Sequence, residues 1–236
     1  MRDWRKYWRN RERIPDDSPE HALRQVGHTL LGSPIGPDQV RLITESIQRS
    51  LELTASDQVV DFGCGNGFFT REISKLVARI HGVDASQVLI DTAEAYFKTS
   101  NCTYSFGDIA RDDTLRSLPF KPAKSYSYGV FQHLSAGEAD GMLRTMQELC
   151  GEGFLLFAAH IPDKDRIQAF YNTPERWRLY EDSLKSNTEQ MGHWWRKEEL
   201  IQVCVGLGLH CQVMLQDANL ETSRYRFNAL IRGGER

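Results

Sequence analysis

The sequence predicts an α/β fold of the doubly wound kind, with a mainly parallel seven-stranded sheet and helices on both faces. From residue 58 to residue 161, short apolar runs alternate with amphipathic stretches, a rhythm typical of parallel strands joined by crossover helices. The last two apolar runs have no helix between them, which predicts a C-terminal antiparallel hairpin. The 236 residues, 40% of them hydrophobic, suffice for one such domain with an added flap.

The N-terminal segment, residues 1–37, differs in composition from the rest of the chain. Trp4, Tyr7 and Trp8 stand at helical spacing among basic residues, and prolines punctuate the remainder. We expect a short helix followed by an irregular arm that acts as a lid. In this interpretation Trp4 and Trp8 pack downward while the arginines beside them stay in solvent.

The domain proper is expected to span residues 38–232. Strands are predicted at residues 58–63, 79–86, 102–108, 125–134, 153–161, 209–217 and 223–233. Helices are predicted at residues 38–53, 66–78, 86–100, 135–150 and 196–208. Residues 162–195 are polar and aromatic and too long for an ordinary connection, so we expect a helical insertion that covers the substrate.

The composition excludes several classes of protein. A formal charge of -3 and a pI near 6.2 do not suit a surface that binds nucleic acid. Five cysteines without a CxxC pair argue against a disulfide framework and for a reducing compartment. We find no signal-type N-terminus and no apolar run of the ~20 residues that a membrane span needs. The prediction is a cytoplasmic protein.

The most informative stretch is "VVDFGCGNG", in which glycines stand at positions 63, 65 and 67 after Asp61. A glycine turn between a strand and a helix lets backbone approach a ligand at the carboxyl edge of the sheet. The dinucleotide fingerprint GxGxxG does not fit, because Phe68 stands where its third glycine would be. No Gly-Lys-Ser/Thr follows, so a phosphate loop is excluded.

These residues resemble the first motif of the class I S-adenosylmethionine-dependent methyltransferases. The resemblance covers roughly residues 38–232 and implies that Asp84 binds the ribose hydroxyls and that Asp108 accepts from the adenine amino group. The resemblance also implies that Asp61 lies near the cofactor's amino group or holds the glycine loop in place. One departure is the missing Phe-Asp before the fourth strand. The cofactor-binding residues so implied are Asp61, Gly63, Cys64, Gly65, Gly67, Phe68, Asp84, Ala85, Asp108, Ile109 and Phe131.

Motifs that mark other subclasses of this family are missing from the sequence. After the fourth strand there is no Asn/Asp-Pro-Pro-aromatic box of base-modifying enzymes and no double-glutamate loop of arginine methyltransferases. Nor is there the acid cluster of metal-dependent enzymes, so no metal is expected. The resemblance therefore implies a small-molecule or glycan acceptor and leaves the oligomeric state open.

Three histidines are candidates for a general base, which methyl transfer to a weakly acidic hydroxyl requires. His133 is placed after the fourth strand, His160 at the end of the fifth, and His193 in the insertion. Each could instead only hydrogen-bond to a nearby carbonyl. We therefore expect O-methylation of a small molecule or sugar. The alternatives are N-methylation of a neutral amine, which needs no base, and a non-catalytic scaffold of the same fold.

Aromatic and polar residues outside the motifs are candidates for binding the acceptor. A tryptophan can stack on a sugar ring, although core packing is an equal alternative. The stretch that contains Gln25 and His28 resembles one seen ahead of the first motif in bacterial enzymes linked to polysaccharide or natural-product pathways. The candidates are Trp4, Trp8, Gln25, His28, Tyr171, Trp194 and Trp195. Arg166, Arg224 and Arg226 are weaker candidates for recognising an acidic acceptor.

Overall fold

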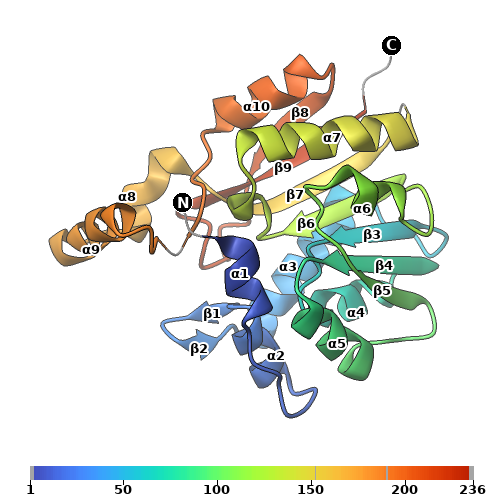
Figure 1. The fold of residues 1–236 in the computed structure, drawn as a ribbon, viewed down its shortest axis with the longest axis horizontal. Helices are drawn as coiled ribbons and strands as arrows, with labels where there is room; N and C mark the ends of the chain where they lie inside the picture. The colour runs from blue at the N-terminus through green and yellow to red at the C-terminus, as the bar shows by residue number, and fades with distance from the viewer. Residues whose placement is uncertain (1–2, 152, 190, 234–236) are drawn as a thin grey trace.

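Seven strands form one sheet in the computed structural model, which describes residues 3–151, 153–189 and 191–233 (Figure 1). In chain order the strands are β3 (Gln58–Phe62), β4 (Arg79–Asp84), β5 (Cys102–Phe106), β6 (Lys124–Tyr128), β7 (Leu155–Pro162), β8 (His210–Leu215) and β9 (Arg226–Arg232). Their spatial order is β5-β4-β3-β6-β7-β9-β8. Only β9 runs antiparallel to its neighbours β7 and β8, so the predicted sheet and hairpin are confirmed.

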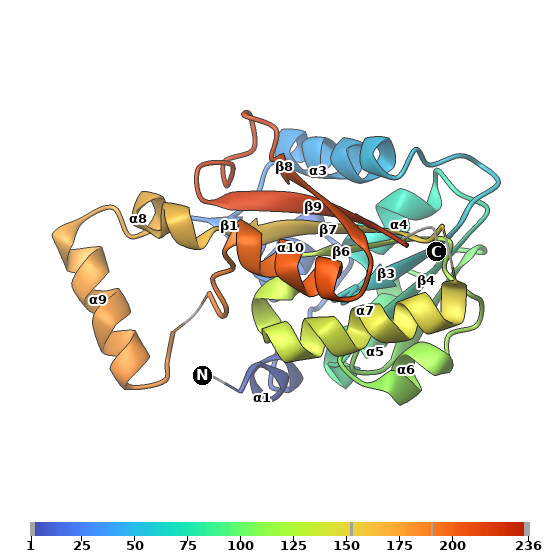
Figure 2. The ribbon, with the colours of Figure 1, turned by 90° about the horizontal axis from the view of Figure 1, so that it is seen from above.

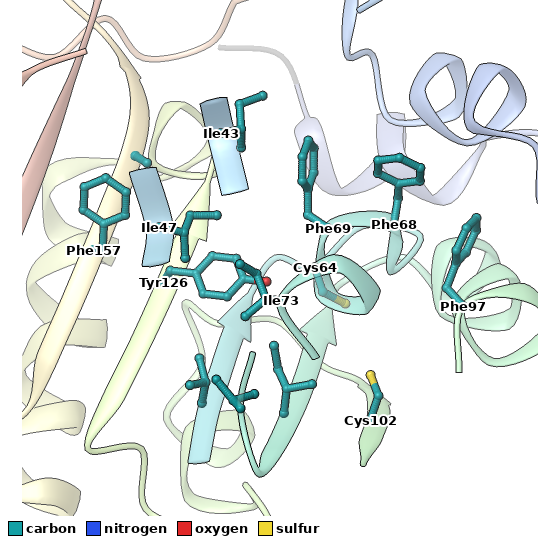
Figure 3. Packing of buried hydrophobic residues seen from close by; sticks show 14 of the residues in the cluster. Ile43, Ile47, Cys64, Phe68, Phe69, Ile73, Phe97, Cys102, Tyr126 and Phe157 are labelled. Atoms are coloured by element: carbon teal, nitrogen blue, oxygen red, sulfur yellow. The ribbon is translucent and has the colours of Figure 1, made fainter. Parts of the chain in front are cut away.

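Helices cover both faces of this sheet (Figure 2). Apolar side chains of the first group of helices join one core cluster, and those of the second group join another. The first group is α3 (Pro37–Ser50), α4 (Phe68–Ser74) and α5 (Gln87–Tyr96), and the second is α6 (Asp112–Arg116), α7 (Ala136–Cys150) and α10 (Lys197–Gly206). Figure 3 shows Ile47 of α3 and Ile73 of α4 beside the ring of Tyr126 from the sheet.

The alternation of side chains along a strand explains why one sheet can serve two cores. In β3, Val59 belongs to the first cluster, whereas Val60 and Phe62 belong to the second. The strand order reverses between β3 and β6, because β4 follows β3 on one side and β6 lies on the other. In open α/β sheets this reversal creates a crevice at the carboxyl ends of the strands, where ligands bind.

The fourth strand of the sheet is shorter than the sequence predicts. Residues 125–134 read as one strand, but β6 ends at Tyr128. Gly129 has a φ of 73°, which turns the chain out of the sheet, and a 3-10 helix (η1, Phe131–His133) follows. The residues after the strand therefore run across the ligand edge.

The N-terminal segment forms two helices and a short ribbon. Helix α1 (Trp4–Arg9) lies near the carboxyl ends of the strands (Figure 1). Helix α2 (Pro19–Gln25) contributes the fully buried Ala22 and Leu23 to the first core cluster. The ribbon pairs β1 (Thr29–Leu30) with β2 (Ser33–Pro34). Only the first part of this segment is thus arranged as a cover, since α2 is part of the core.

The predicted insertion forms a 3-10 helix η2 (Lys164–Arg166) and the helices α8 (Ile167–Phe170) and α9 (Pro174–Lys185). In both views α9 extends beyond the end of the sheet, and it has no buried residue (Figures 1 and 2). Within the described ranges, the helices are too short or too polar to traverse a lipid bilayer.

Candidate active site

Two cavities meet at the carboxyl edge of the sheet. The first, of about 190 Å³, extends from the glycine turn past β4 and β5 to α1. The second, of about 740 Å³, lies between the residue 27–43 region and the helices α8 and α9. Residues that line both cavities are called the junction here: Gly27, His28, Tyr128, His160 and Arg226. The two cavities are therefore adjacent at the junction.

The glycines of the turn are required mainly by the protein's own packing. Gly63, Gly65 and Gly67 all have positive φ, at 75°, 57° and 83°. A Cβ on Gly63 would lie 2.4 Å from Val130, and one on Gly67 would lie 2.7 Å from the Tyr104 hydroxyl. The sequence suggested bare backbone that approaches a ligand. Side chains of the protein occupy the Cβ positions of these two glycines, while Gly63 and Gly65 line the first cavity and Gly67 does not.

Two carboxylates are buried beside the turn. Asp84 ends β4 and accepts hydrogen bonds from the N–H groups of Gly65 and Ser86, each at 2.9 Å. Burial raises its pKa to about 6. Asp61 accepts from the hydroxyls of Thr70 and Tyr126, and burial raises its pKa to about 7. Both line the first cavity, where a cationic or hydrogen-bond-donating ligand would favour their ionised forms.

Helix α1 closes the far end of the first cavity with a basic side chain. The Arg5 Nε lies 2.5 Å from Asp108 Oδ2, and its Nη2 lies 2.7 Å from Glu138. The expectation that the arginines beside Trp4 and Trp8 stay in solvent is therefore wrong for Arg5. Arg5 is paired with Asp108, the carboxylate that the resemblance assigns to the adenine amino group.

His133 is enclosed by the two tryptophans of α1. Its ring lies 4.5 Å from that of Trp4, and its Nε2 accepts from the Trp8 indole N–H at 3.3 Å. The Gln132 amide nitrogen also lies 3.3 Å from this Nε2. Burial, followed by the charge of Arg226, lowers the pKa of His133 to about 3. Its basic nitrogen is already an acceptor, which makes it a poor base.

His160 has a basic nitrogen left for a reaction. The Thr222 hydroxyl donates to Gln216 at 2.9 Å, so its oxygen can only accept from His160 Nδ1, 3.4 Å away. This assignment puts the proton of the neutral ring on Nδ1 and the lone pair on Nε2. Burial, and next the charge of Arg226, lowers the pKa of His160 well below its ordinary value. The ring is therefore neutral near pH 7.

A strained backbone holds His160 in this position. Its φ is 64°, a left-handed conformation that few residues other than glycine adopt. The strand β7 carries one extra residue against β9 between Ala158 and Ile161, which makes a β-bulge. The His160 N–H donates to the Asn228 side chain at 3.0 Å, and the ring stacks on Tyr128 at 4.6 Å. Such strain is typical of functional positions.

Of the other predicted residues, some line the cavities and some do not. Trp4, Trp8, Cys64, Gly63, Gly65, Phe68, Ala85, Asp108 and Ile109 line the first cavity, and Tyr171 lines the second. Outside both lie His193, which is 3.1 Å from Glu199, and Gln25, which bonds to Glu12 and Asn66. Trp195 is fully buried and donates to the Phe131 carbonyl, and Trp194 packs against Phe170 and Tyr171. Those two tryptophans are core residues here.

Sequence reasoning missed three polar residues around the junction, namely Tyr128, Gln132 and Asn228. Nothing in the sequence favoured Arg226 over Arg166 and Arg224 as a candidate for recognising an acidic acceptor. Alternation would put residues 224 and 226 on one face of a strand, but β9 begins at Arg226 and Arg224 is exposed in the preceding loop. No signal in the sequence distinguishes them. Among the described residues, no group of three or more His, Cys, Asp or Glu side chains is arranged for a metal ion.

A glycine turn after β3, carboxylates after β4 and β5, and a cavity between them define a Rossmann-like α/β protein with a nucleoside-binding edge. Residues 59–153 match the family model described as a methyltransferase domain. A malonyl-[acyl-carrier protein] O-methyltransferase of Bacillus cereus is 28% identical over 160 residues, which are 64% of this chain and 54% of that relative. The chain thus spans about half the length of this relative.

Solved structures of methyltransferases have a similar fold. A magnesium protoporphyrin IX methyltransferase of Synechocystis with bound SAH has a TM-score of 0.60 at 15% identity, covering 88% of this chain and 84% of that one. A Haloferax volcanii methyltransferase complex with the Trm112 activator has a TM-score of 0.64 at 16% identity, covering 91% and 95%. Residues 59–153 thus belong to a methyltransferase domain family, and the chain has the fold of the class I S-adenosylmethionine-dependent methyltransferases.

Proposed function

We propose that this protein transfers the methyl group of S-adenosylmethionine to a hydroxyl oxygen of a small molecule or sugar, with His160 as the general base. The observation that carries the proposal is the position of His160. It lines both cavities, and its Nε2 lone pair has no competing donor among the described residues. Neither His133, whose Nε2 is engaged, nor His193, which is outside the cavities, meets these conditions.

The first cavity fits the cofactor in its chemistry. Asp84 has lone pairs beyond those bonded to backbone N–H groups and would accept from the ribose hydroxyls. Ala85, Leu89 and Ile109 supply apolar walls for a base. The bound cofactor would supply an electrophilic methyl group on a sulfonium centre. Because this displacement is in line, the alignment of the two reactants across the junction would contribute most of the rate, on the order of 7–11 kcal/mol.

In this proposal the two flanking segments act as covers. Within residues 1–37, α1 would be the lid of the first cavity, because Trp4, Arg5 and Trp8 all line it. Within residues 162–195, α8 and α9 would enclose the acceptor, because Tyr171 and Tyr180 line the second cavity. Excluding water would protect the reacting hydroxyl and strengthen the interactions around it.

The test is His160→Asn, since asparagine tolerates a left-handed backbone but has no imidazole. Release of S-adenosylhomocysteine is measured with a panel of hydroxylated sugars and phenols. We expect kcat to fall by about 10²–10⁴-fold for the variant, with the affinity for S-adenosylhomocysteine unchanged.

His193→Asn is the matched control and should retain turnover, because His193 lies outside both cavities. A His160→Asn enzyme that keeps turnover within tenfold of wild type would rule out the base. If amines were then methylated in place of hydroxyls, N-methylation would replace the proposal.

A further inference from the structure

Arg226 is a buried cation that has no carboxylate partner among the described residues. It is the first residue of β9 and only 5% exposed. Its Nη1 donates to Gln132 Oε1 at 2.8 Å and to the His160 carbonyl at 2.5 Å. Its Nη2 lies 3.7 Å from the Met191 sulfur, its Nε has no partner, and the Tyr225 side chain interacts with the guanidinium. One end of the guanidinium is therefore anchored, and the other edge has no anionic partner among the described residues.

A buried charge without a counter-ion is costly, and proteins normally pair or neutralise it. Arg166, in the nearby η2, has the usual arrangement, since it is part exposed and lies 3.5 Å from Asp163. The titratable groups around Arg226 are His28, Tyr128, His133, His160 and Tyr225. Near pH 7 the three histidines and Tyr128 are neutral, so none of these four compensates the charge.

We propose that Arg226 binds an anionic group, a carboxylate or a phosphate, on the methyl acceptor in the second cavity. This inference rests on the proposed function, since it names the chemical class of that acceptor. The Nε and Nη2 hydrogens of a guanidinium form one fork that matches two oxyanion oxygens, and this is the edge that has no anionic partner among the described residues.

The surroundings of Arg226 fit an anion. No carboxylate is among the junction residues, and the acids of the second cavity, Asp182 and Glu221, are exposed at its outer part. Arg226 also contributes to the lowered pKa of His160. An anion on Arg226 would offset that effect, so the correct acceptor would make its own base stronger.

The experiment is calorimetric titration of the full chain, saturated with S-adenosylhomocysteine, at constant ionic strength. The probes are malonate, inorganic phosphate and the neutral malonamide. The variants are Arg226→Gln and Arg226→Lys, with Arg166→Gln as a matched arginine that already has an acid partner. We expect saturable binding of malonate or phosphate but not of malonamide. Arg226→Gln should weaken it at least tenfold, Arg226→Lys should weaken it less, and Arg166→Gln should leave it unchanged.

Each outcome decides a separate point. Binding of malonate alone identifies a carboxylate site, binding of phosphate alone a phosphate site, and binding of both a general oxyanion site. If neither binds to the wild-type protein, or if both Arg226 variants bind as the wild type does, the inference is overturned. If Arg226→Gln does not fold, Arg226→Lys alone makes the comparison. Failure to bind S-adenosylhomocysteine would instead overturn the proposed function.

Discussion

The two cavities that meet at His160 have opposite electrostatic characters. The first is lined by Asp61, Asp84 and Asp108, and burial raises the pKa of the first two. At the inner end of the second are Arg226 and histidines whose pKa values are lowered. Burial alone destabilises both kinds of charge, so each region favours a ligand of the opposite sign. A cationic methyl donor and an anionic acceptor would satisfy both.

The largest expected effect on the acidic side comes from Asp84→Ala. This change removes the carboxylate that would accept from two ribose hydroxyls, and each hydrogen bond to a charged group is worth about 1.5–3 kcal/mol. We expect the affinity for S-adenosylhomocysteine, measured by calorimetry, to fall by about 100-fold or more. Asp140→Ala, an exposed acid on α7 that pairs with Arg144, is the control and should have no effect. A loss of less than threefold for Asp84→Ala would show that the ribose binds elsewhere.

The same comparison explains what could be predicted from the sequence. The acidic side is built from residues at or just beyond the ends of consecutive strands, so Asp61, Asp84 and Asp108 were identified from short motifs. The junction instead joins His28, Tyr128, His160 and Arg226, which come from four distant parts of the chain. Only a three-dimensional structure brings them together.

Local conformation caused the other differences between the sequence-based prediction and the structure. The stretch 125–134 has the apolar pattern of a strand, but the positive φ of Gly129 ends it early. His193 stands near aromatic residues as His160 does, yet its partner is Glu199, three residues into the next helical segment. These contacts cannot be predicted from the pattern of residue types. The same pattern does show the apolar runs from which all seven strands were predicted.

A second prediction concerns the pH dependence of ligand affinity, which should differ between the cavity with buried acids and the cavity with a buried cation. Asp84 must be ionised to accept from both ribose hydroxyls, and its pKa in the free protein is about 6. Below that value, binding must first remove a proton, so the affinity for S-adenosylhomocysteine should fall by up to about tenfold per pH unit. Burial raises the pKa of Asp61 in the same cavity to about 7, so the affinity should level off only above that value.

Calorimetry between pH 4.5 and 8 measures this dependence. Asp84→Asn should flatten it, because the amide has no proton to lose in this range. Arg226 stays charged throughout this range, so it adds no such dependence to the second cavity. A wild-type affinity that is independent of pH down to 4.5 would mean that Asp84 is not the linked group.

The smallest expected effect concerns Arg5, a cation that lines the acidic cavity. Arg5 holds Asp108, which the family resemblance assigns to the adenine amino group, so Arg5 and adenine would compete for one carboxylate. Its side chain is 40% exposed, and an ion pair of this exposure is worth at most about 1 kcal/mol. Arg5→Ala should therefore raise the affinity for S-adenosylhomocysteine by up to about fivefold.

Arg9→Ala, at an exposed position of the same helix, controls for changes in helix stability and should leave the affinity unchanged. Trp8→Ala should act in the opposite direction, because it removes a side chain that lines the cavity and holds His133. If Arg5→Ala weakens binding as Trp8→Ala does, Arg5 does not compete with the cofactor. It would then hold the lid closed through Glu138, and the acidic cavity would bind its cationic ligand with one carboxylate permanently paired.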